Sequence, residues 1–348
     1  MVLSIVDGGK GLIEQWTNAA THAGIEIRYS TPLTGLIVKE GFVRGVYVNG
    51  VPVESTAVIL CCGGFEASPR LRAQYLGPNW DLAHVRGTPY NTGDGLEISL
   101  RDVNAKFVGN WSGCHSVAWD ANSPPNSGSR ELTNQYTKSG YPLGLMLNSV
   151  GERFVDEGID MRNFTYAKFG REILKQPGSF AFQVWDKTGK KWLRVEEYGD
   201  DVVTKITADT IAELAEKLTS HGLSHPDKFV ETVAEYNEAV DAFQQENSNI
   251  QFDPSVKDGV STQSSKKKLH LPKSNWALPI QEGPFVAVKV TCGVTFTFGG
   301  LAVNPANAAV ISNADEKDIP GLWAAGEIVG GCFFGNYPVS QRPLTWLT

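Results

Sequence analysis

The chain lacks the features that mark membrane, secreted or zinc-binding proteins. No run of its 348 residues approaches ~18 consecutive apolar residues, and residues 1–8 lack the basic-then-apolar layout of a secretory signal. We therefore expect an intracellular, cytoplasmic protein without a membrane span. The five cysteines (61, 62, 114, 292 and 332) are odd in number and contain no CxxC pair, so we expect small core residues and neither disulfides nor a metal site.

Basic charge is scarce as well. The net charge is −7, and the longest basic run is Lys266–Lys268. A nucleic-acid surface is therefore not expected, and an anionic ligand would have to be held by a few local cations. The chain does have 41% hydrophobic residues and a length that allows two domains with a substantial core.

The most informative segment is residues 321–331, which read Gly-Leu-Trp-Ala-Ala-Gly-Glu-Ile-Val-Gly-Gly. Leu322–Ala325 has the composition of a strand buried on both faces, and glycines that permit close approach to a ligand follow it. Glu327, the one carboxylate here, is placed to accept hydrogen bonds from hydroxyl groups. This pattern is typical of a strand that ends at a nucleotide cofactor, although a plain strand followed by a loop also fits it.

Glycine, proline and turn signals also divide the first part of the chain into short elements. We expect a helix over residues 12–20, a strand over 25–29 and a small antiparallel meander over 36–53, whose Asn49-Gly50 pair is a strong hairpin signal. A buried strand over 57–62 ends at Gly63-Gly64, and Ser68-Pro69 then begins a helix.

Residues 92–95, Thr-Gly-Asp-Gly, open a further helix over 96–103. The N-terminus of a helix favours an anionic or polar ligand group, whereas the alternative interpretation makes Asp94 a simple N-cap. Residues 111–284 differ in character and contain amphipathic helices near 211–218 and 229–236, before strands return at 287–290 and 294–298. The pattern predicts one sheet domain, 1–110 and 285–348, interrupted by a second domain, 111–284.

One expected element is missing. A Rossmann-type dinucleotide site needs a strand, a G-x-G-x-x-G turn and a helix, so that the glycines admit a pyrophosphate to the helix N-terminus. Residues 8–11, Gly-Gly-Lys-Gly, precede a helix but follow no strand and lack the third glycine. The sequence therefore offers only part of such a domain.

Five motifs in fixed order resemble the fumarate reductase/succinate dehydrogenase flavoprotein superfamily. They are Gly63-Gly64, Thr92–Gly95, Gly151–Glu157, Val294–Gly300 and Gly321–Glu327. Asp156–Gly170 and Gly335–Pro338 further resemble the tricarballylate dehydrogenase branch. The resemblance, which extends up to Pro338, implies an α/β fold with an α+β insertion: a partial, Rossmann-like FAD-binding domain interrupted by a capping domain, with substrate between them.

The resemblance also implies roles for individual residues. Gly63, Gly64, Thr92, Gly93, Asp94, Gly95, Gly326 and Glu327 would contact FAD, Glu327 through cofactor hydroxyls. His115 resembles a histidine that binds a substrate carboxylate, and Thr297 and Tyr337 would also bind the substrate. Arg162 resembles the arginine that exchanges a proton with substrate carbon, although it lies one residue further from Glu157 than in that pattern. An arginine is a poor base unless its environment lowers its pKa.

Departures from the fumarate reductase pattern narrow the expected reaction. Residues 134–141 contain no Glu and Arg pair for proton relay, Phe296 replaces a substrate-binding histidine, and Tyr337 stands where a carboxylate-binding arginine is expected. Because the tricarballylate branch shares the last two features, we expect oxidation of a small polycarboxylate such as tricarballylate to cis-aconitate, by hydride transfer to flavin N5. The electron acceptor is not indicated.

Two other hypotheses stay open. After Pro338 the family continues with a Gly-Gly-Ser-Gly turn, whereas this chain reads Val-Ser-Gln-Arg, so the sequence is expected to be truncated at both ends, or altered in reading frame. It could then be a non-catalytic fragment that does not bind FAD. The third hypothesis is a steroid- or enone-type flavin dehydrogenase of the same superfamily.

Overall fold

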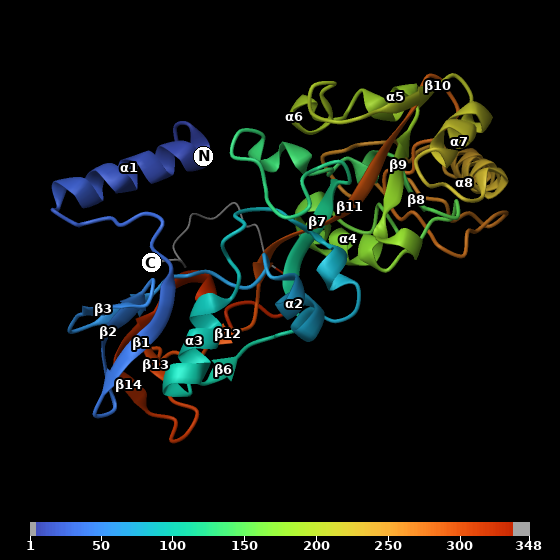
Figure 1. The fold of residues 1–348 in the computed structure, drawn as a ribbon. Helices are drawn as coiled ribbons and strands as arrows, with labels where there is room; N and C mark the ends of the chain where they lie inside the picture. Colours follow the sequence, from blue (N-terminus) through green and yellow to red (C-terminus); the bar gives the residue numbers. More distant parts are fainter. Residues whose placement is uncertain (1–4, 337–348) are drawn as a thin grey trace.

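The structure, a computed structural model, describes residues 5–336 and forms an elongated molecule of two parts (Figure 1). The first part contains the elements α1 (Gly8–His22), β1 (Leu33–Lys39), β2 (Phe42–Val48), β3 (Val51–Glu54), β4 (Val58–Leu60), α2 (Pro69–Leu71), α3 (Asp94–Val103), β6 (Phe107–Val108), β12 (Gly300–Leu301), β13 (Ala309–Ile311) and β14 (Asp318–Ala324). The second contains β5 (His84–Val85), β7 (Cys114–Asp120), β8 (Leu145–Asn148), α4 (Arg162–Leu174), β9 (Ala181–Trp185), α5 (Lys187–Lys190), α6 (Val195–Tyr198), β10 (Ile206–Ala208), α7 (Ile211–Thr219), α8 (Pro226–Glu246) and β11 (Phe285–Thr297).

The predicted meander is confirmed as the antiparallel sheet β1-β2-β3. Asn49 and Gly50 both adopt positive φ, 50° and 78°, as the tight turn between β2 and β3 requires. α3 is anchored to this sheet because the Asp102 carboxylate accepts a 2.8 Å hydrogen bond from the N–H of Leu36.

The two glycine-flanked strands of the sequence lie side by side. β4 and β14 pair in parallel, with Val58 opposite Leu322 and Leu60 opposite Ala324, so that both strands end at the same edge of the sheet. All four side chains are buried, whereas Ile59, on the other face of β4, is 65% exposed. Within residues 5–336, β4 pairs with β14 alone and is the edge strand of this sheet.

β11 is the central element of the second part. The two strands predicted over 287–290 and 294–298 form this single strand, which runs from one part of the molecule to the other (Figure 1). It pairs with β9 and β10 near its start and with β7 and β5 near its end. Side chains alternate between the two faces of β8. Leu145 and Leu147 therefore pack into a core beneath α7 and α8, whereas Met146 packs into a core beneath α4.

Some local predictions are wrong. Residues 25–29 form no strand; Ile25, Ile27 and Tyr29 are exposed, and no neighbouring strand within residues 5–336 offers hydrogen bonds to them. Asp94 is the first residue of α3 rather than its N-cap, which is Gly93. Cys114 and Cys292 are buried as expected, but Cys61, Cys62 and Cys332 are exposed.

None of the helices in residues 5–336 has the length and apolarity needed to cross a membrane. Across the same residues, no group of His, Cys, Asp and Glu side chains is arranged to hold a metal ion.

Candidate functional site

Glu66, Asn91 and Glu327 meet where β4 and β14 end. Asn91 Nδ2 donates to Glu66 Oε1 at 2.6 Å and lies 3.5 Å from Glu327 Oε2. Glu327 Oε1 accepts a 2.9 Å hydrogen bond from the N–H of Thr297, while Glu66 Oε2 is buried without a hydrogen-bond partner among the described residues. The strand ends thus hold two neighbouring carboxyl groups, one of which retains an unused buried oxygen.

Burial and like charge determine the protonation of this pair. Burial first, and then the neighbouring Glu327 carboxylate, raises the pKa of Glu66 to about 9. Burial also raises the pKa of Glu327, but the backbone N–H groups of Thr297 and Gly64 favour its charged form. Near neutral pH, the Glu66 carboxyl group is therefore protonated.

The predicted glycines bring three segments together around Glu327. A Cβ atom on Gly64 would lie 2.1 Å from Thr297 Oγ1 and 2.4 Å from Glu327 Oε1, and one on Gly95 would lie 2.9 Å from Ile328 Cδ1. Gly63 and Gly93 both adopt positive φ, 76° and 85°, which favours glycine. The structure therefore collects Gly63, Gly64, Gly95 and Glu327, with Thr92, Gly93 and Asp94 leading into α3 next to them.

The residues at the strand ends suit FAD in two respects, namely the hydrogen bonds that their carboxyl groups can form and the exposed glycine beside them. The Glu327 carboxylate and the unused oxygen of Glu66 are suited to ligand hydroxyls, and they lie beyond the carboxyl ends of parallel strands, where nucleotide ligands bind in open α/β sheets. Gly326 has a φ of 79°, is exposed, and would meet no atom within 4 Å on gaining a Cβ, so its surface is open to a ligand.

His115 and Thr297 lie on paired strands, but their surroundings differ. His115, on β7, is 3% exposed, and burial followed by the charge of Arg86 lowers its pKa to about 3. It is therefore a neutral imidazole near pH 7, and its ring lies edge-on to Tyr166 with centroids 5.0 Å apart. Thr297 Oγ1 instead accepts from the N–H of Phe65 at 3.3 Å and lies 3.4 Å from Glu327 Oε1, so this side chain belongs to the strand-end cluster.

Arg162 begins α4 and starts a chain of hydrogen bonds. Its Nη1 donates to Ser139 Oγ at 3.1 Å, and Ser139 Oγ donates to Glu197 Oε2 at 2.5 Å. Glu197 Oε1 accepts from Arg194 Nη1 at 3.1 Å, and the Arg194 side chain is 52% exposed. Residues 134–141 contain no Glu and Arg pair. The fold nevertheless connects Arg162 to the Glu197 carboxylate of α6 and to Arg194, the residue before α6.

Two cavities border this chain of hydrogen bonds, and a third cavity adjoins one of them. The cationic cavity, about 470 Å³, is lined among others by Arg86, Asn134, Ser139, Arg162, Tyr166 and Arg194. The outer cavity, about 500 Å³, shares Arg86 and Asn134 with it and also includes Arg130 and Thr295.

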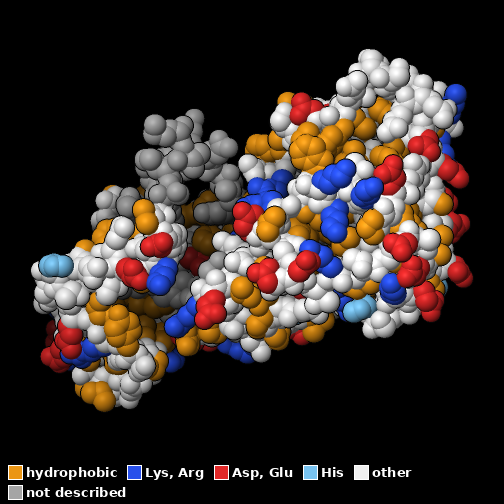
Figure 2. Space-filling model, turned by 90° about the horizontal axis from the view of Figure 1, so that it is seen from above, with side chains coloured by type: hydrophobic (Ala, Val, Ile, Leu, Met, Phe, Trp, Pro, Cys, Tyr) orange, Lys and Arg blue, Asp and Glu red, His pale blue; other side chains and the backbone are white. Residues whose placement is uncertain are grey.

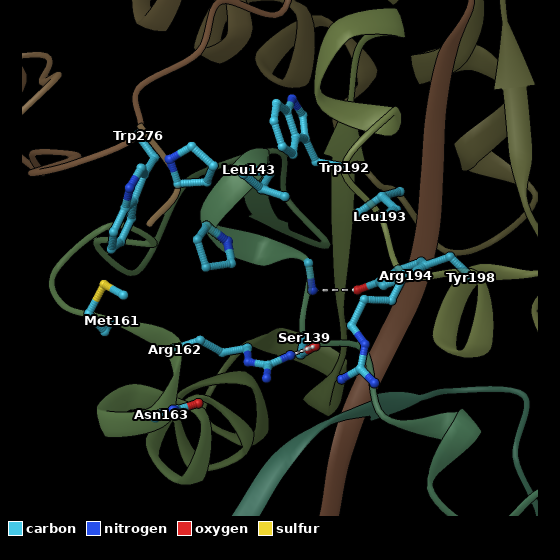
Figure 3. A pocket seen from close by; sticks show the side chains of 13 residues that line it. Ser139, Leu143, Met161, Arg162, Asn163, Trp192, Leu193, Arg194, Tyr198 and Trp276 are labelled. Atoms are coloured by element: carbon cyan, nitrogen blue, oxygen red, sulfur yellow. Dashed lines mark hydrogen bonds between the residues drawn. The ribbon is translucent and has the colours of Figure 1, made fainter. Parts of the chain in front are cut away.

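The apolar cavity, about 290 Å³, shares Ser139, Arg162 and Arg194 with the cationic one. Figure 3 shows its apolar wall of Leu143, Met161, Trp192, Leu193 and Trp276, with the two arginines at one end. Lys and Arg side chains also gather near the middle of the face in Figure 2, beside the hollow between the two ends of the molecule.

No motif in the sequence pointed to Arg86, Ser139, Arg194 or Glu197 around the cavity, or to Glu66 and Asn91 at the strand ends. Glu197 lies 35 positions beyond Arg162, and no motif spacing relates the two; only the packing of α6 against the segment of Ser139 brings them together. Arg86 precedes the Thr92–Gly95 motif but reaches the cavity because its N–H bonds to Val294 O of β11 at 2.8 Å. Tyr337, the remaining predicted substrate residue, lies outside the described residues.

Comparison with known proteins agrees with the geometry. The family model described as FAD binding domain matches residues 4–344. The probable fumarate reductase Ifc3 of Shewanella frigidimarina is 26% identical over 93% of this chain and 48% of its own length. The 3-oxosteroid 1-dehydrogenase of Mycolicibacterium smegmatis is 27% identical over 96% of this chain and 59% of its own length.

A solved structure has the same fold. The open conformation of a flavocytochrome c3 fumarate reductase superimposes with a TM-score of 0.68 at 24% identity, over 92% of this chain and 50% of that one. The predicted fold class, a mixed helix and sheet architecture of the FAD-binding flavoprotein type, is confirmed. The chain spans about half the length of these relatives.

Proposed function

Because the chain belongs to the FAD binding domain family, we propose that it is an FAD-dependent oxidoreductase that acts on a CH–CH bond of a small polycarboxylate such as tricarballylate. The observation that carries this proposal is the convergence of Arg86 and Arg162 on one cavity, with neutral His115 beside its wall. Arginine side chains match the geometry of carboxylates, so a cavity with two of them suits an acid better than a neutral ketone.

The proposal divides the chain into two working parts. Residues 1–110 and 285–348 would supply the cofactor side, through the strand-end cluster of Glu66, Asn91 and Glu327. Residues 111–284 would supply the capping side, through Arg162 and its partners, and Arg86 of the first segment would reach the same cavity. β11 joins the two, since its Thr297 contacts Glu327 while its first residues pair with β9 and β10.

Each side has a chemical task. Glu327 would hold cofactor hydroxyls, and bound FAD would accept the hydride taken from substrate. Arg86 and Arg162 would bind carboxylates, and His115 would donate a hydrogen bond as a neutral imidazole. Arg162 is also the proposed proton-transfer group, a role supported by the route of hydrogen bonds through Ser139 Oγ to Glu197 and the exposed Arg194.

The test begins with the cofactor. Purified chain should be yellow and should gain thermal stability on addition of FAD. FAD-loaded chain should then reduce a dye acceptor when given tricarballylate, and His115→Ala should weaken that activity. Colourless protein whose unfolding temperature ignores added FAD would instead support a non-catalytic chain without cofactor.

A steroid- or enone-type dehydrogenase is the second candidate, and the apolar cavity favours it. The wall of Leu143, Trp192 and Trp276 suits a large apolar substrate better than tricarballylate. In that case an apolar 3-oxosteroid such as androstenedione would reduce the bound flavin, tricarballylate would not, and His115→Ala would have little effect.

A further inference from the structure

Arg86 lies between the cationic and outer cavities and contributes to the walls of both. It follows β5, and its side chain spans to neighbouring segments: Nη1 donates to Thr295 Oγ1 at 3.2 Å and Nη2 donates to Asn134 Oδ1 at 2.9 Å. Its guanidinium also lies 5.7 Å from the Trp119 ring centroid. The side chain is therefore held in one orientation without a ligand.

The positive charge of Arg86 has no counter-ion in the part of the chain that the structure describes. Both hydrogen-bond partners are neutral, and no carboxylate of residues 5–336 approaches within 4.0 Å. Its Nε atom is buried and has no hydrogen-bond partner there. A guanidinium stays charged at physiological pH, and charges withdrawn from water are normally paired in folded proteins.

The carboxylates nearby are already engaged. Glu196 and Glu197, which also line the cationic cavity, both pair with Arg194, at 3.8 and 3.1 Å. Arg86 and Arg162 are then the arginines of this wall without an ion pair among the described residues. They come from different elements, and Arg86 also borders the outer cavity.

We propose that Arg86 is a specificity-determining residue that anchors one carboxylate of the substrate while Arg162 serves another, so that the site selects acids with at least two carboxylates over monocarboxylates. This inference rests on the proposed function because it concerns the same site. An incoming carboxylate would supply the missing counter-ion and accept from the buried Nε, with Thr295 and Asn134 keeping the guanidinium in place.

The test measures equilibrium binding rather than turnover. FAD-treated chain is titrated calorimetrically with tricarballylate, which has three carboxylates, and with butyrate, which has one. Arg86→Met should weaken tricarballylate binding roughly 10- to 100-fold, because a charge-assisted hydrogen-bonded contact is lost, and should change butyrate binding by less than about threefold. Arg44→Met removes the same charge from an exposed site on β2 and should leave both affinities unchanged.

Stability separates a binding role from a structural one. Since Arg86 lacks a counter-ion, Arg86→Met should keep or raise the unfolding temperature of ligand-free chain, whereas loss of a structural arginine would lower it. If Arg86→Met does not fold, Arg86→Lys retains the charge without the planar fork, and it should still weaken tricarballylate more than butyrate.

The two proposals fail in different ways. Equal weakening of both acids, or unchanged tricarballylate binding by Arg86→Met or Arg86→Lys, would overturn the role of Arg86 and leave the proposed function standing. If wild-type chain binds FAD but neither acid, and binds androstenedione instead, both proposals fall.

Discussion

Glu157 and Glu66 are buried carboxyl groups, 0% and 2% exposed, in opposite electrostatic surroundings. Glu157, in the second part of the molecule, pairs with Arg153 and accepts from the N–H of Met146 at 2.8 Å. Glu66, at the strand ends of the first part, lies beside another carboxyl group, Glu327, and keeps one oxygen without a partner among the described residues. The core of the second part balances its charges internally, whereas the strand ends do not.

The difference indicates where a ligand belongs. An uncompensated charge costs stability, so a fold that tolerates Glu66 beside Glu327, and Arg86 without a counter-ion, places its unbalanced groups around its cavities and strand ends. A structural charged group such as Arg153 has partners within the protein. Besides its ion pair with Glu157, the Nη1 atom of Arg153 donates to Leu271 O at 2.9 Å. The pattern agrees with the proposed cofactor site at the strand ends and with the proposed substrate site at the cavities.

We expect the largest loss of stability from a substitution in the core of the second part, where buried charges are paired. Glu157→Gln would leave Arg153 and the fully buried Lys273 without their main carboxylate, which should lower the free energy of unfolding by about 3–5 kcal/mol. Urea unfolding measures this. Glu316→Gln removes an exposed carboxylate paired with Lys106 at 2.6 Å and should cost less than about 1 kcal/mol. Equal losses in both variants would erase the contrast between the two parts.

Glu66→Gln should instead raise the free energy of unfolding near neutral pH. The pKa of Glu66 is raised from 4.5 to about 9, so between these values the folded chain holds a proton that the unfolded chain has released. The stability that this proton contributes is complete below pH 4.5 and is lost as pH rises toward 9, by up to about 1.4 kcal/mol per pH unit. Glu66→Gln should remove that slope and stabilise the chain near pH 7 by about 3 kcal/mol.

Unfolding titrations at several pH values between 5 and 9 would follow this slope. Glu54→Gln, which alters an exposed carboxylate paired with Lys39, should leave the pH dependence as in wild type. A wild-type chain whose stability rises with pH across this window would contradict the assignment of the proton to Glu66.

Ser139→Ala should have a smaller effect, at the border between the balanced core and the cavity. It removes the hydroxyl between Arg162 and Glu197 and should cost about 1 kcal/mol of stability. In FAD-loaded chain it should lower kcat more than it changes KM, since the route for a proton from Arg162 is cut.

Ser261→Ala is the matched control for Ser139→Ala, because it removes a hydroxyl that donates to Lys273 O at 2.9 Å, away from the cavity. It should cost similar stability without a kinetic effect. Equal kcat in the two variants would rule out a role of Ser139 in proton transfer.

The sequence predicted the glycines and Glu327 of the strand-end region, but not Glu66 or Asn91, and it predicted little of the cavity. Gly63, Gly64, Gly95 and Glu327 could be found because close backbone approach leaves a local glycine pattern. The partnership of Arg162 with Ser139 and Glu197 could not, because it depends on how α4, α6 and the intervening loops pack. The strand expected over 25–29 failed for a related reason: alternation of apolar residues predicts a strand only if a neighbour completes its hydrogen bonds.

The smallest effect is expected in α1, which lies apart from the rest of the first part in Figure 1. Gly11 is its one buried residue, and Trp16 is 68% exposed. Trp16→Ser should therefore change the free energy of unfolding by less than about 0.5 kcal/mol, because little apolar area leaves a packed environment. Phe229→Ala in α8, whose ring is fully buried, should cost about 3–5 kcal/mol in the same urea experiment. If Trp16→Ser were nearly as costly as Phe229→Ala, α1 would be packed against another surface in solution, and the contrast in packing between the two parts would no longer hold.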